Sequence, residues 1–401
     1  MKKTRQCLKW MRIAVVIGLM SGCICMASTP KPLKVIVMAG QSNMQGYVNV
    51  STFDSMADDP KTAPILKEMR NADGTPRVCE KVWISSIGCA GNDVKEQTGK
   101  VTTGFGASTS AIGPEFTFGI YLEKRLQEPI LLIKTAWGGK SLNTDFRPPS
   151  AGPYLFNETQ SAAFAKDGKD LAAIKAAKAK ETGVYYRLMV EHVRKVLADI
   201  KRVYPDYDPK DGYELAGFVW FQGWNDLCDG DTYPNRNKTG GYDVYSDLLA
   251  KFIRDVRKDL NAPRLPFVIG VLGVGGVKQQ GVFHQAMAAP AALPEFKGNV
   301  VAVETAPFWD EDLDQLHGRW DVAVQKINNT IKEEVKKNPK MTPEAQQEIR
   351  KQVKDELFTP EEQKRLTGIS HWDCHYHGAA KIMAPIGKAL AEAMADLQKT
   401  R

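Results

Sequence analysis

Five apolar runs divide the chain, and each is followed by glycine or polar residues. Within the runs, polar and apolar side chains do not alternate, which is typical of strands buried on both faces in a parallel sheet. The five runs are Val35–Met38, Pro129–Ile133, Leu215–Phe221, Pro266–Leu272 and Val300–Glu304. A further segment, Val82–Ile87, fits another strand or part of a surface hairpin equally well, and residues 98–113, rich in Gly, Ser and Thr, predict a loop.

Segments with helical periodicity separate these runs. Between Tyr185 and Val203, apolar side chains recur every three or four positions, which predicts a helix with one face in the core. Helices are also expected from Pro114 onward and over residues 162–182, 243–260, 283–293 and 379–397. Alternating strands and helices predict an α/β protein, a three-layer α/β/α sandwich around a central, mostly parallel sheet of about five strands.

Two segments stand apart from this pattern. Residues 321–366 are dense in Lys, Glu and Gln, and they predict a charged helical insertion on the surface rather than a separate domain. Residues 1–28 resemble an export signal, because basic residues precede the apolar run Ile13–Met20, which is too short to span a bilayer. The remainder, residues 29–401, is expected to form one domain.

Two cleavage sites are possible for the export signal. Leu19–Cys23 resembles a bacterial lipoprotein box, in which case Cys23 becomes a lipidated N-terminus that anchors the protein to a membrane; alternatively, cleavage falls near Ala27. In both cases the protein is exported to the periplasm, the cell surface or the medium, where disulfides are permitted. The sequence does not specify how the remaining cysteines pair; these are Cys79, Cys89, Cys228 and Cys374.

The formal charge of +7 overstates the basic character of the mature chain. Five basic residues lie in the export signal, and without them 49 basic side chains face 47 acidic ones. This balance gives no reason to expect a nucleic-acid partner. No Cys/His cluster has the spacing of a zinc site, and neither a metal nor an organic cofactor is expected.

The candidate chemistry follows the apolar runs. Ser42, Gly139 and Asn225 come after three different runs, and the carboxyl ends of parallel strands meet at the edge of a sheet where ligands bind. The histidine-rich segment Ser370–Gly378 precedes the last helix. A serine nucleophile needs a base, a group that orients the base, and N–H donors for the oxyanion. Four histidines are expected to be structural rather than catalytic: His192, His284, His317 and His371.

Five motifs resemble those of the sialate O-acetylesterase-like carbohydrate esterases, part of the wider SGNH, or GDSL-type, hydrolase superfamily. They are Gly40–Met44, Gly113–Glu115, Thr135–Ser141, Trp220–Gly223 and His375–Gly378. The resemblance extends from about residue 33 to 395, apart from the charged insertion. It implies a flavodoxin-like α/β/α fold and a serine esterase that removes acetyl groups from sugars.

The resemblance also implies roles for single residues. Ser42 matches the nucleophile, and its backbone N–H would contribute to the oxyanion hole together with Gly139. Asn225, in a Gly-x-Asn-Asp block, matches the side-chain oxyanion donor. Many relatives have Gln-Gly-Glu at this point, so Gln222 could share or take that role. His375 matches the base.

The acid departs from the pattern of the superfamily, which often spaces acid and base as Asp-x-x-His. Here Asp373 lies two residues before His375. Asp373 is the expected acid, but another loop could supply it, or serine and histidine could act as a dyad. His377 is the alternative base.

An acetylated carbohydrate is the expected substrate, and Gln41, Arg147 and Trp224 are expected to contact it. Arg147 could instead pair with Asp145. The sequence does not identify the sugar or the hydroxyl that carries the acetyl group. Two alternatives remain: a glycan-binding protein without catalysis on the same scaffold, and a serine esterase for non-carbohydrate esters. In the first alternative, three tryptophans could stack on sugars or simply pack in the core or rim: Trp137, Trp224 and Trp372.

Overall fold

The computed structural model describes residues 31–89 and 93–399. The expected export signal over residues 1–28, with Cys23, lies outside the described residues. Pro32–Arg401 forms one compact unit. In the part of the chain that is described, no helix has both the length and the apolar character needed to cross a membrane.

The described residues build a central sheet of seven strands in the order β4–β3–β6–β1–β7–β8–β9. Neighbouring strands pair in parallel, except for the antiparallel pair of β3 and β4. The strands are β1 (Leu33–Gly40), β3 (Val82–Ile87), β4 (Gln97–Lys100), β6 (Ile130–Ala136), β7 (Tyr213–Phe221), β8 (Phe267–Val271) and β9 (Val300–Glu304). The predicted α/β/α sandwich with a mostly parallel sheet is confirmed, with two strands more than expected.

The two additional strands lie together at one edge of the sheet. Val82–Ile87 forms β3, which pairs with β6 on one side and with β4 on the other. The prediction of loop throughout 98–113 is wrong for β4, Gln97–Lys100, and for the short strand β5, Ala111–Ile112. The edge strand β4 is short, polar and only partly buried, so it has no apolar run that could mark it in the sequence.

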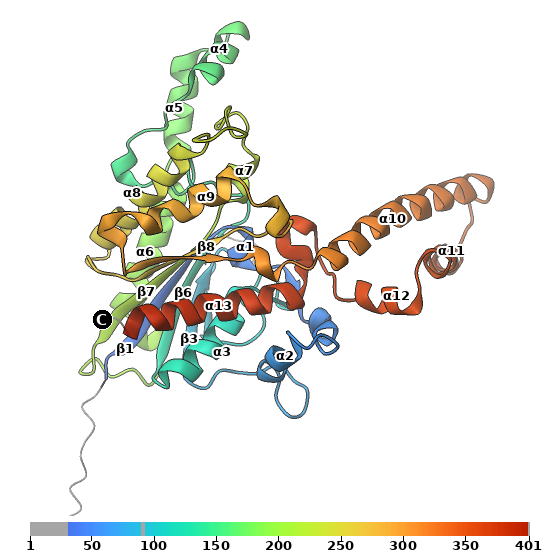
Figure 1. Ribbon diagram of the computed structural model, residues 1–401, viewed down its shortest axis with the longest axis horizontal. Helices are drawn as coiled ribbons and strands as arrows, with labels where there is room; N and C mark the ends of the chain where they lie inside the picture. Colours follow the sequence, from blue (N-terminus) through green and yellow to red (C-terminus); the bar gives the residue numbers. More distant parts are fainter. Residues whose placement is uncertain (1–30, 90–92, 400–401) are drawn as a thin grey trace, which may run out of the picture. The chain divides into compact units, whose positions relative to one another are not determined.

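Helices cover both faces of the sheet. α3 (Pro114–Leu126) and α13 (Ala380–Lys399) pack together on one face, whereas α6 (Val184–Ala198) and α8 (Asp243–Asp259) lie on the other (Figure 1). Gly217 of β7 allows α13 to come close, because an added Cβ would lie 2.2 Å from Met394 Sδ. On the opposite face, the Phe252 ring of α8 lies 4.4 Å from the Trp220 ring of β7. The helices predicted in these regions are confirmed.

Shorter elements complete the unit. The short helices are α1 (Ser42–Gln45), α2 (Ala63–Met69), α7 (Trp224–Cys228) and α9 (Val282–Ala288), and β2 (Val48–Asn49) pairs with β5 (Ala111–Ile112). The 3₁₀ helices are η1 (Val50–Met56), η2 (Pro149–Ala151), η3 (Ile200–Arg202), η4 (Val277–Gln279), η5 (Ala289–Ala292), η6 (Pro294–Phe296), η7 (Ala306–Phe308) and η8 (Asp373–Gly378).

Two helical segments contribute little to the main core. α4 (Glu158–Lys166) and α5 (Leu171–Glu181) have no buried residue. The charged insertion consists of α10 (Glu311–Lys337), α11 (Pro343–Leu357) and α12 (Pro360–Leu366), so its first helix starts ten residues before the predicted boundary at 321. Two small apolar clusters, around Phe358 and around Ile327, hold these three helices together.

The four described cysteines are all free thiols. Cys79 and Cys89 are buried in the main core, and Cys228 is exposed. Burial raises the pKa of the Cys79 thiol to about 12, so this group stays protonated at physiological pH.

Candidate active site

The ends of β1, β6 and β7 lie side by side at one edge of the sheet. Gly40 of β1 pairs with Ala136 of β6 on one side and with Phe221 of β7 on the other. The three segments that follow these residues therefore meet at the carboxyl edge, where ligands bind in open α/β sheets. These segments carry the expected nucleophile and the expected oxyanion donors.

Ser42 begins the four-residue helix α1 directly after β1. Gly40 allows the end of β1 to lie close to β7 and to α1, because an added Cβ would lie 2.1 Å from Phe221 O and 2.9 Å from Met44 Cβ. The Ser42 side chain is 5% exposed, and its Oγ lies 3.4 Å from Gln41 Nε2. The Ser42 N–H has no hydrogen bond to another described residue, as expected for the first turn of a helix.

A buried ion pair lies next to the end of α1 and holds it in place. Lys134 of β6 and Glu115 of α3 are both fully buried, with Nζ 2.6 Å from Oε2. Lys134 Nζ also donates to Gln45 O at 2.8 Å, and Glu115 Oε1 accepts the Gly113 N–H at 2.9 Å. The Gly113–Glu115 motif therefore fixes the end of α1, a role that its spacing in the sequence did not predict.

Gln41 joins the end of β1 to the end of β7. Its Oε1 accepts hydrogen bonds from Gln222 Nε2 and from the N–H groups of Gly223 and Asn225, each at 3.2 Å. Its Nε2 donates to Asn225 Oδ1 at 2.8 Å. Gln41 was expected to contact substrate, but it is fully buried and these partners occupy its amide.

The two candidate oxyanion amides differ in what surrounds them. Gln222 is fully buried; its Nε2 donates to Asp226 Oδ2 at 2.7 Å and to Lys140 O at 3.1 Å, and its Oε1 accepts from Tyr245 Oη at 3.1 Å. Asn225 is half-buried, and its Oδ1 accepts from Gln41. Asn225 therefore fits the donor role better, because the Gln222 amide already has partners within the protein.

Asp226, the last residue of the Gly-x-Asn-Asp block, is a buried carboxylate for which the sequence suggested no role. It accepts hydrogen bonds from the Leu142 and Asn143 N–H groups at 2.7 and 3.2 Å, from Gln222 Nε2 at 2.7 Å and from Tyr233 Oη at 2.9 Å. Burial raises the pKa of Asp226 to about 6, although these hydrogen bonds oppose the shift. Asp226 thus ties the segment after β6 to the segment after β7.

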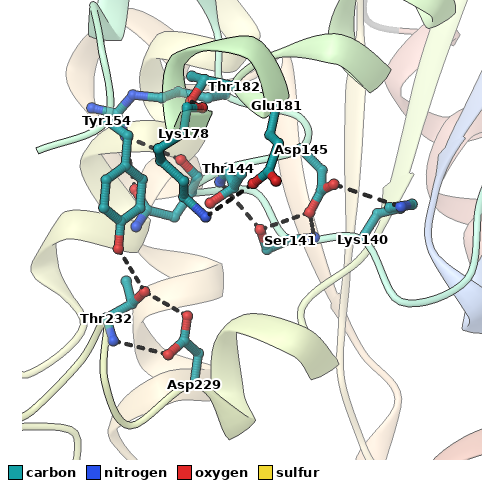
Figure 2. A network of polar contacts seen from close by, with 12 residues as sticks. Lys140, Ser141, Thr144, Asp145, Tyr154, Lys178, Glu181, Thr182, Asp229 and Thr232 are labelled. Carbon is teal, nitrogen blue, oxygen red and sulfur yellow. Dashed lines mark hydrogen bonds and ion pairs between the residues drawn. The ribbon is translucent and has the colours of Figure 1, made fainter. Parts of the chain in front are cut away.

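The segment after β6 presents Gly139 in a left-handed conformation with φ of +71°. An added Cβ would meet no atom within 4 Å, so this glycine faces open space. The following turn is closed by Asp145, whose Oδ2 accepts from the Ser141 N–H at 2.9 Å and from Ser141 Oγ at 3.0 Å (Figure 2). Lys140 lies beside the same carboxylate and over the Tyr185 ring.

Arg147 was expected to contact substrate, with pairing to Asp145 as the alternative, and the structure gives its guanidinium other partners. Nε donates to Gly152 O at 2.9 Å, Nη1 to Asn143 Oδ1 at 2.7 Å and Nη2 to Ala151 O at 3.2 Å. Burial lowers the pKa of Arg147. These bonds hold the loop over residues 143–152 in place.

The three candidate sugar-stacking tryptophans lie in different surroundings. Trp137 is buried, and its Nε1 donates to Asp93 O at 2.9 Å. Trp224 is half-buried at the start of α7, and Trp372 is 69% exposed. Trp224 and Trp372 therefore remain accessible for stacking.

The histidine-rich turn η8 is held over the sheet edge by a buried tyrosine. Tyr376 Oη accepts from the Gly273 N–H after β8 at 2.9 Å and lies 2.8 Å from Thr305 Oγ1 after β9. Tyr376, His377 and Gly378 all have positive φ, at 54°, 57° and 56°. Two consecutive non-glycine residues in this region are costly and persist only where surrounding contacts hold them.

His375 lies on this turn, which contacts α1. Its ring stacks on Tyr47 at 4.3 Å between centroids, and its Nδ1 lies 2.8 Å from His371 Nδ1. Burial, followed by His371, lowers the pKa of His375 to about 4, while Asp373 opposes the shift. Among the described residues, Ser42 Oγ makes no hydrogen bond to His375, and such bonds are often loose in a site without substrate.

Asp373 and His377, the expected acid and the alternative base, have other surroundings. Asp373 is exposed and its Oδ1 accepts the Cys374 N–H at 2.7 Å; no described contact joins it to His375. His377 is fully buried, with Nε2 3.1 Å from Asp314 Oδ1 of α10 and its ring against that of His317. His377 therefore faces the base of the charged insertion.

A second serine–histidine–acid grouping lies between β3 and α6. Ser85 Oγ donates to Glu96 Oε1 at 2.6 Å and lies 2.9 Å from His192 Nε2. The acid thus bonds the serine rather than the histidine, which is not the order of a catalytic triad. Burial lowers the pKa of His192 to about 4. Within the described residues, no group of three His, Cys, Asp or Glu side chains could hold a metal ion.

The chain is similar to a protein family and to solved structures. The model of a family described as carbohydrate esterase, sialic acid-specific acetylesterase matches residues 32–333. Among solved structures, a protein of Arabidopsis thaliana is 19% identical, with a TM-score of 0.36, over 68% of this chain and 86% of that one. A carbohydrate acetylesterase from Xanthomonas citri is 13% identical, with a TM-score of 0.36, over 68% of this chain and 49% of that one.

No curated protein matches the chain. The family model, in contrast, covers well over half of it, including β1 to β9 and the segments that carry Ser42, Gly139 and Asn225. The protein therefore belongs to the carbohydrate esterase family described as sialic acid-specific acetylesterases.

Proposed function

We propose that the protein is an exported serine esterase that removes O-acetyl groups from carbohydrates, with Ser42 as nucleophile and His375 as base. The observation that carries the proposal is the meeting of the ends of β1, β6 and β7, in register, beside the turn that bears His375. Membership of a family of carbohydrate acetylesterases supports the reaction class. Trp224 and Trp372 are the side chains that we expect to contact the sugar.

In the proposed reaction, His375 removes the proton of the Ser42 hydroxyl while Oγ bonds to the acetyl carbonyl carbon. The tetrahedral intermediate then breaks its bond to the sugar oxygen, which takes the proton from His375. A water molecule attacks the acetyl-Ser42 and gives a proton to His375. That proton returns to Ser42 Oγ as the acetyl group leaves as acetic acid.

Three N–H donors would stabilise the oxyanion. The Ser42 and Gly139 N–H groups come from the ends of β1 and β6, and Asn225 Nδ2 comes from the end of β7. The partners of Gln41 and Asp226 would keep these donors in place before substrate binds. Loss of one such donor typically raises the barrier by about 3–4 kcal/mol.

The test is acetate release from 4-nitrophenyl acetate and from a panel of acetylated polysaccharides. We expect Ser42→Ala to lower kcat by at least about 1,000-fold, because the nucleophile is lost. The matched control is Ser108→Ala, an exposed serine outside the site, which should keep wild-type activity. Equal rates in wild type and Ser42→Ala would overturn the proposal. Glycan binding without turnover would favour the non-catalytic alternative.

A further inference from the structure

We propose that His371, and not Asp373, is the positioning residue that orients His375. This inference rests on the proposed function, because it names the third member of the same catalytic set. The observation behind it is the distance of 2.8 Å between His371 Nδ1 and His375 Nδ1. In a serine hydrolase, the group that contacts Nδ1 of the base selects its tautomer and fixes its ring.

The backbone of the turn holds His371 in place. The N–H groups of Ser370 and His371 both donate to His377 O, at 2.9 and 3.0 Å. Gly378 packs directly against His371, since an added Cβ would lie 2.8 Å from His371 Cβ. Ser370 Oγ donates to Gly378 O at 2.7 Å. The segment from 370 to 378 thus closes on itself and sets His371 beside the base.

Tyr47 fixes the relative orientation of the two imidazoles. Its ring stacks on His375 with an interplanar angle of 6°, and it lies 4.5 Å from the His371 ring at 53°. The two imidazoles are 4.6 Å apart between centroids. Because Tyr47 contacts both rings, neither can rotate without losing this packing.

The contact between the two Nδ1 atoms links the tautomers of His371 and His375. Only one of these atoms can carry the hydrogen. If His375 is the base, its Nδ1–H donates to His371 Nδ1, and its Nε2 keeps a lone pair for the Ser42 proton. His371 then carries its own hydrogen on Nε2. His371 therefore does what the carboxylate does in the usual triad, but as a neutral acceptor.

Asp373 is poorly placed for the same task. Its carboxylate is exposed and accepts the Cys374 N–H, and it acts on His375 only as a solvent-screened charge. A neutral acceptor stabilises the imidazolium less than a carboxylate would. This difference predicts a base that stays unprotonated into mildly acidic solution, in agreement with burial and His371 lowering the pKa of His375 to about 4. The titratable groups that face His375 are His371, Asp373 and Tyr47.

The test compares kcat, KM and pH–rate profiles of the full chain with 4-nitrophenyl acetate. In His371→Ala the acceptor is lost, so we expect kcat to fall about 100-fold or more with KM changed less than about threefold. In His371→Asp a carboxylate faces Nδ1 of the base, so activity should return. The acid limb of its profile should move up by about 2 pH units, because the carboxylate stabilises the imidazolium. A merely structural role for His371 would not move this limb.

Asp373→Asn decides against the competing assignment. We expect Asp373→Asn to keep kcat within about threefold of wild type. If instead Asp373→Asn lowers kcat about 100-fold while His371→Ala stays near wild type, the positioning role belongs to Asp373. His317→Asn is the matched control, since it removes another half-buried histidine that contacts His377 but not His375. If His371→Ala does not fold, an unchanged acid limb in His371→Asp still overturns the inference. Full activity of Ser42→Ala, in contrast, would refute the proposed function itself.

Discussion

At the scale of single residues, Asp226 explains how two separate segments keep a fixed geometry at the sheet edge. Four hydrogen bonds from these two segments meet at the carboxylate of Asp226, a residue that is 1% exposed. The neighbours of Ser42, the proposed nucleophile, are thus held by a carboxylate that takes no part in the proposed reaction.

Asp226→Asn tests this role. The asparagine amide accepts hydrogen bonds only at its oxygen, and its NH2 group would face groups that now donate to the carboxylate. We therefore expect the free energy of unfolding to fall by about 2 kcal/mol or more, and kcat to fall as well. The pKa of Asp226 is raised to about 6 in the folded protein, from 3.8, so wild type loses stability from this group as pH rises between these values. The deficit of about 2 kcal/mol should therefore appear near pH 4 and disappear toward pH 7, because the raised pKa lowers the stability of wild type alone by up to about 3 kcal/mol over this range.

Denaturant unfolding of both proteins between pH 4 and 8 measures this difference. Asp229→Asn is the matched control, because Asp229 lies three residues further on and its carboxylate, among the described residues, accepts hydrogen bonds from Thr232 alone. A deficit that is constant across the range would show that the pKa of Asp226 is ordinary.

At the scale of elements, the turn η8 depends on an interaction with two strand ends. The Tyr376 hydroxyl satisfies the buried Gly273 N–H and lies beside Thr305 Oγ1. These contacts hold a backbone with two left-handed non-glycine residues, Tyr376 and His377. The position of His375 therefore depends on β8 and β9 as much as on its own segment.

We expect Tyr376→Phe to leave the Gly273 N–H without a partner and to lower the free energy of unfolding by about 1–3 kcal/mol. Because the turn then lacks the hydrogen bond between Tyr376 Oη and the Gly273 N–H, we expect kcat to fall by a larger factor than KM rises. Urea unfolding and steady-state kinetics measure the two effects. Tyr213→Phe, at an exposed position of β7, provides the control. If kcat is unchanged, the turn is held by its backbone alone.

The same elements show what a sequence can and cannot predict. Five strands were predictable because each contains a continuous apolar run, although the edge strand β9 is buried only at Val300. The structure places Ser42 and Asn225 after the adjacent carboxyl ends of β1 and β7, at one edge of the sheet. β4 was missed because a polar edge strand carries no such signal. The contact of His371 with His375 could not be foreseen, since it arises from left-handed backbone at residues other than glycine.

At the scale of the whole molecule, the expected export signal would decide where the esterase acts. We propose that residues 1–28 direct export, with either Cys23 or a residue near Ala27 at the new N-terminus. Intact mass and lipid labelling of the protein from bacterial envelope and medium fractions distinguish the two. Cys23→Ser should remove any lipid label. An unprocessed chain that begins at Met1 and stays in the cytoplasm would contradict export.

The charged insertion begins shortly after η7 and ends shortly before His371 in the chain. The segment from 370 to 378 closes on itself and Tyr376 anchors it to the ends of β8 and β9, while His377 contacts the insertion near the start of α10, at Asp314 and His317. The start of α10 therefore belongs to the surroundings of the turn that bears His375, whereas α11 and α12 pack on α10 through the clusters around Phe358 and Ile327. Shortening or replacing α11 and α12 should therefore leave the proposed catalytic residues in place, whereas a change at the start of α10 should disturb them.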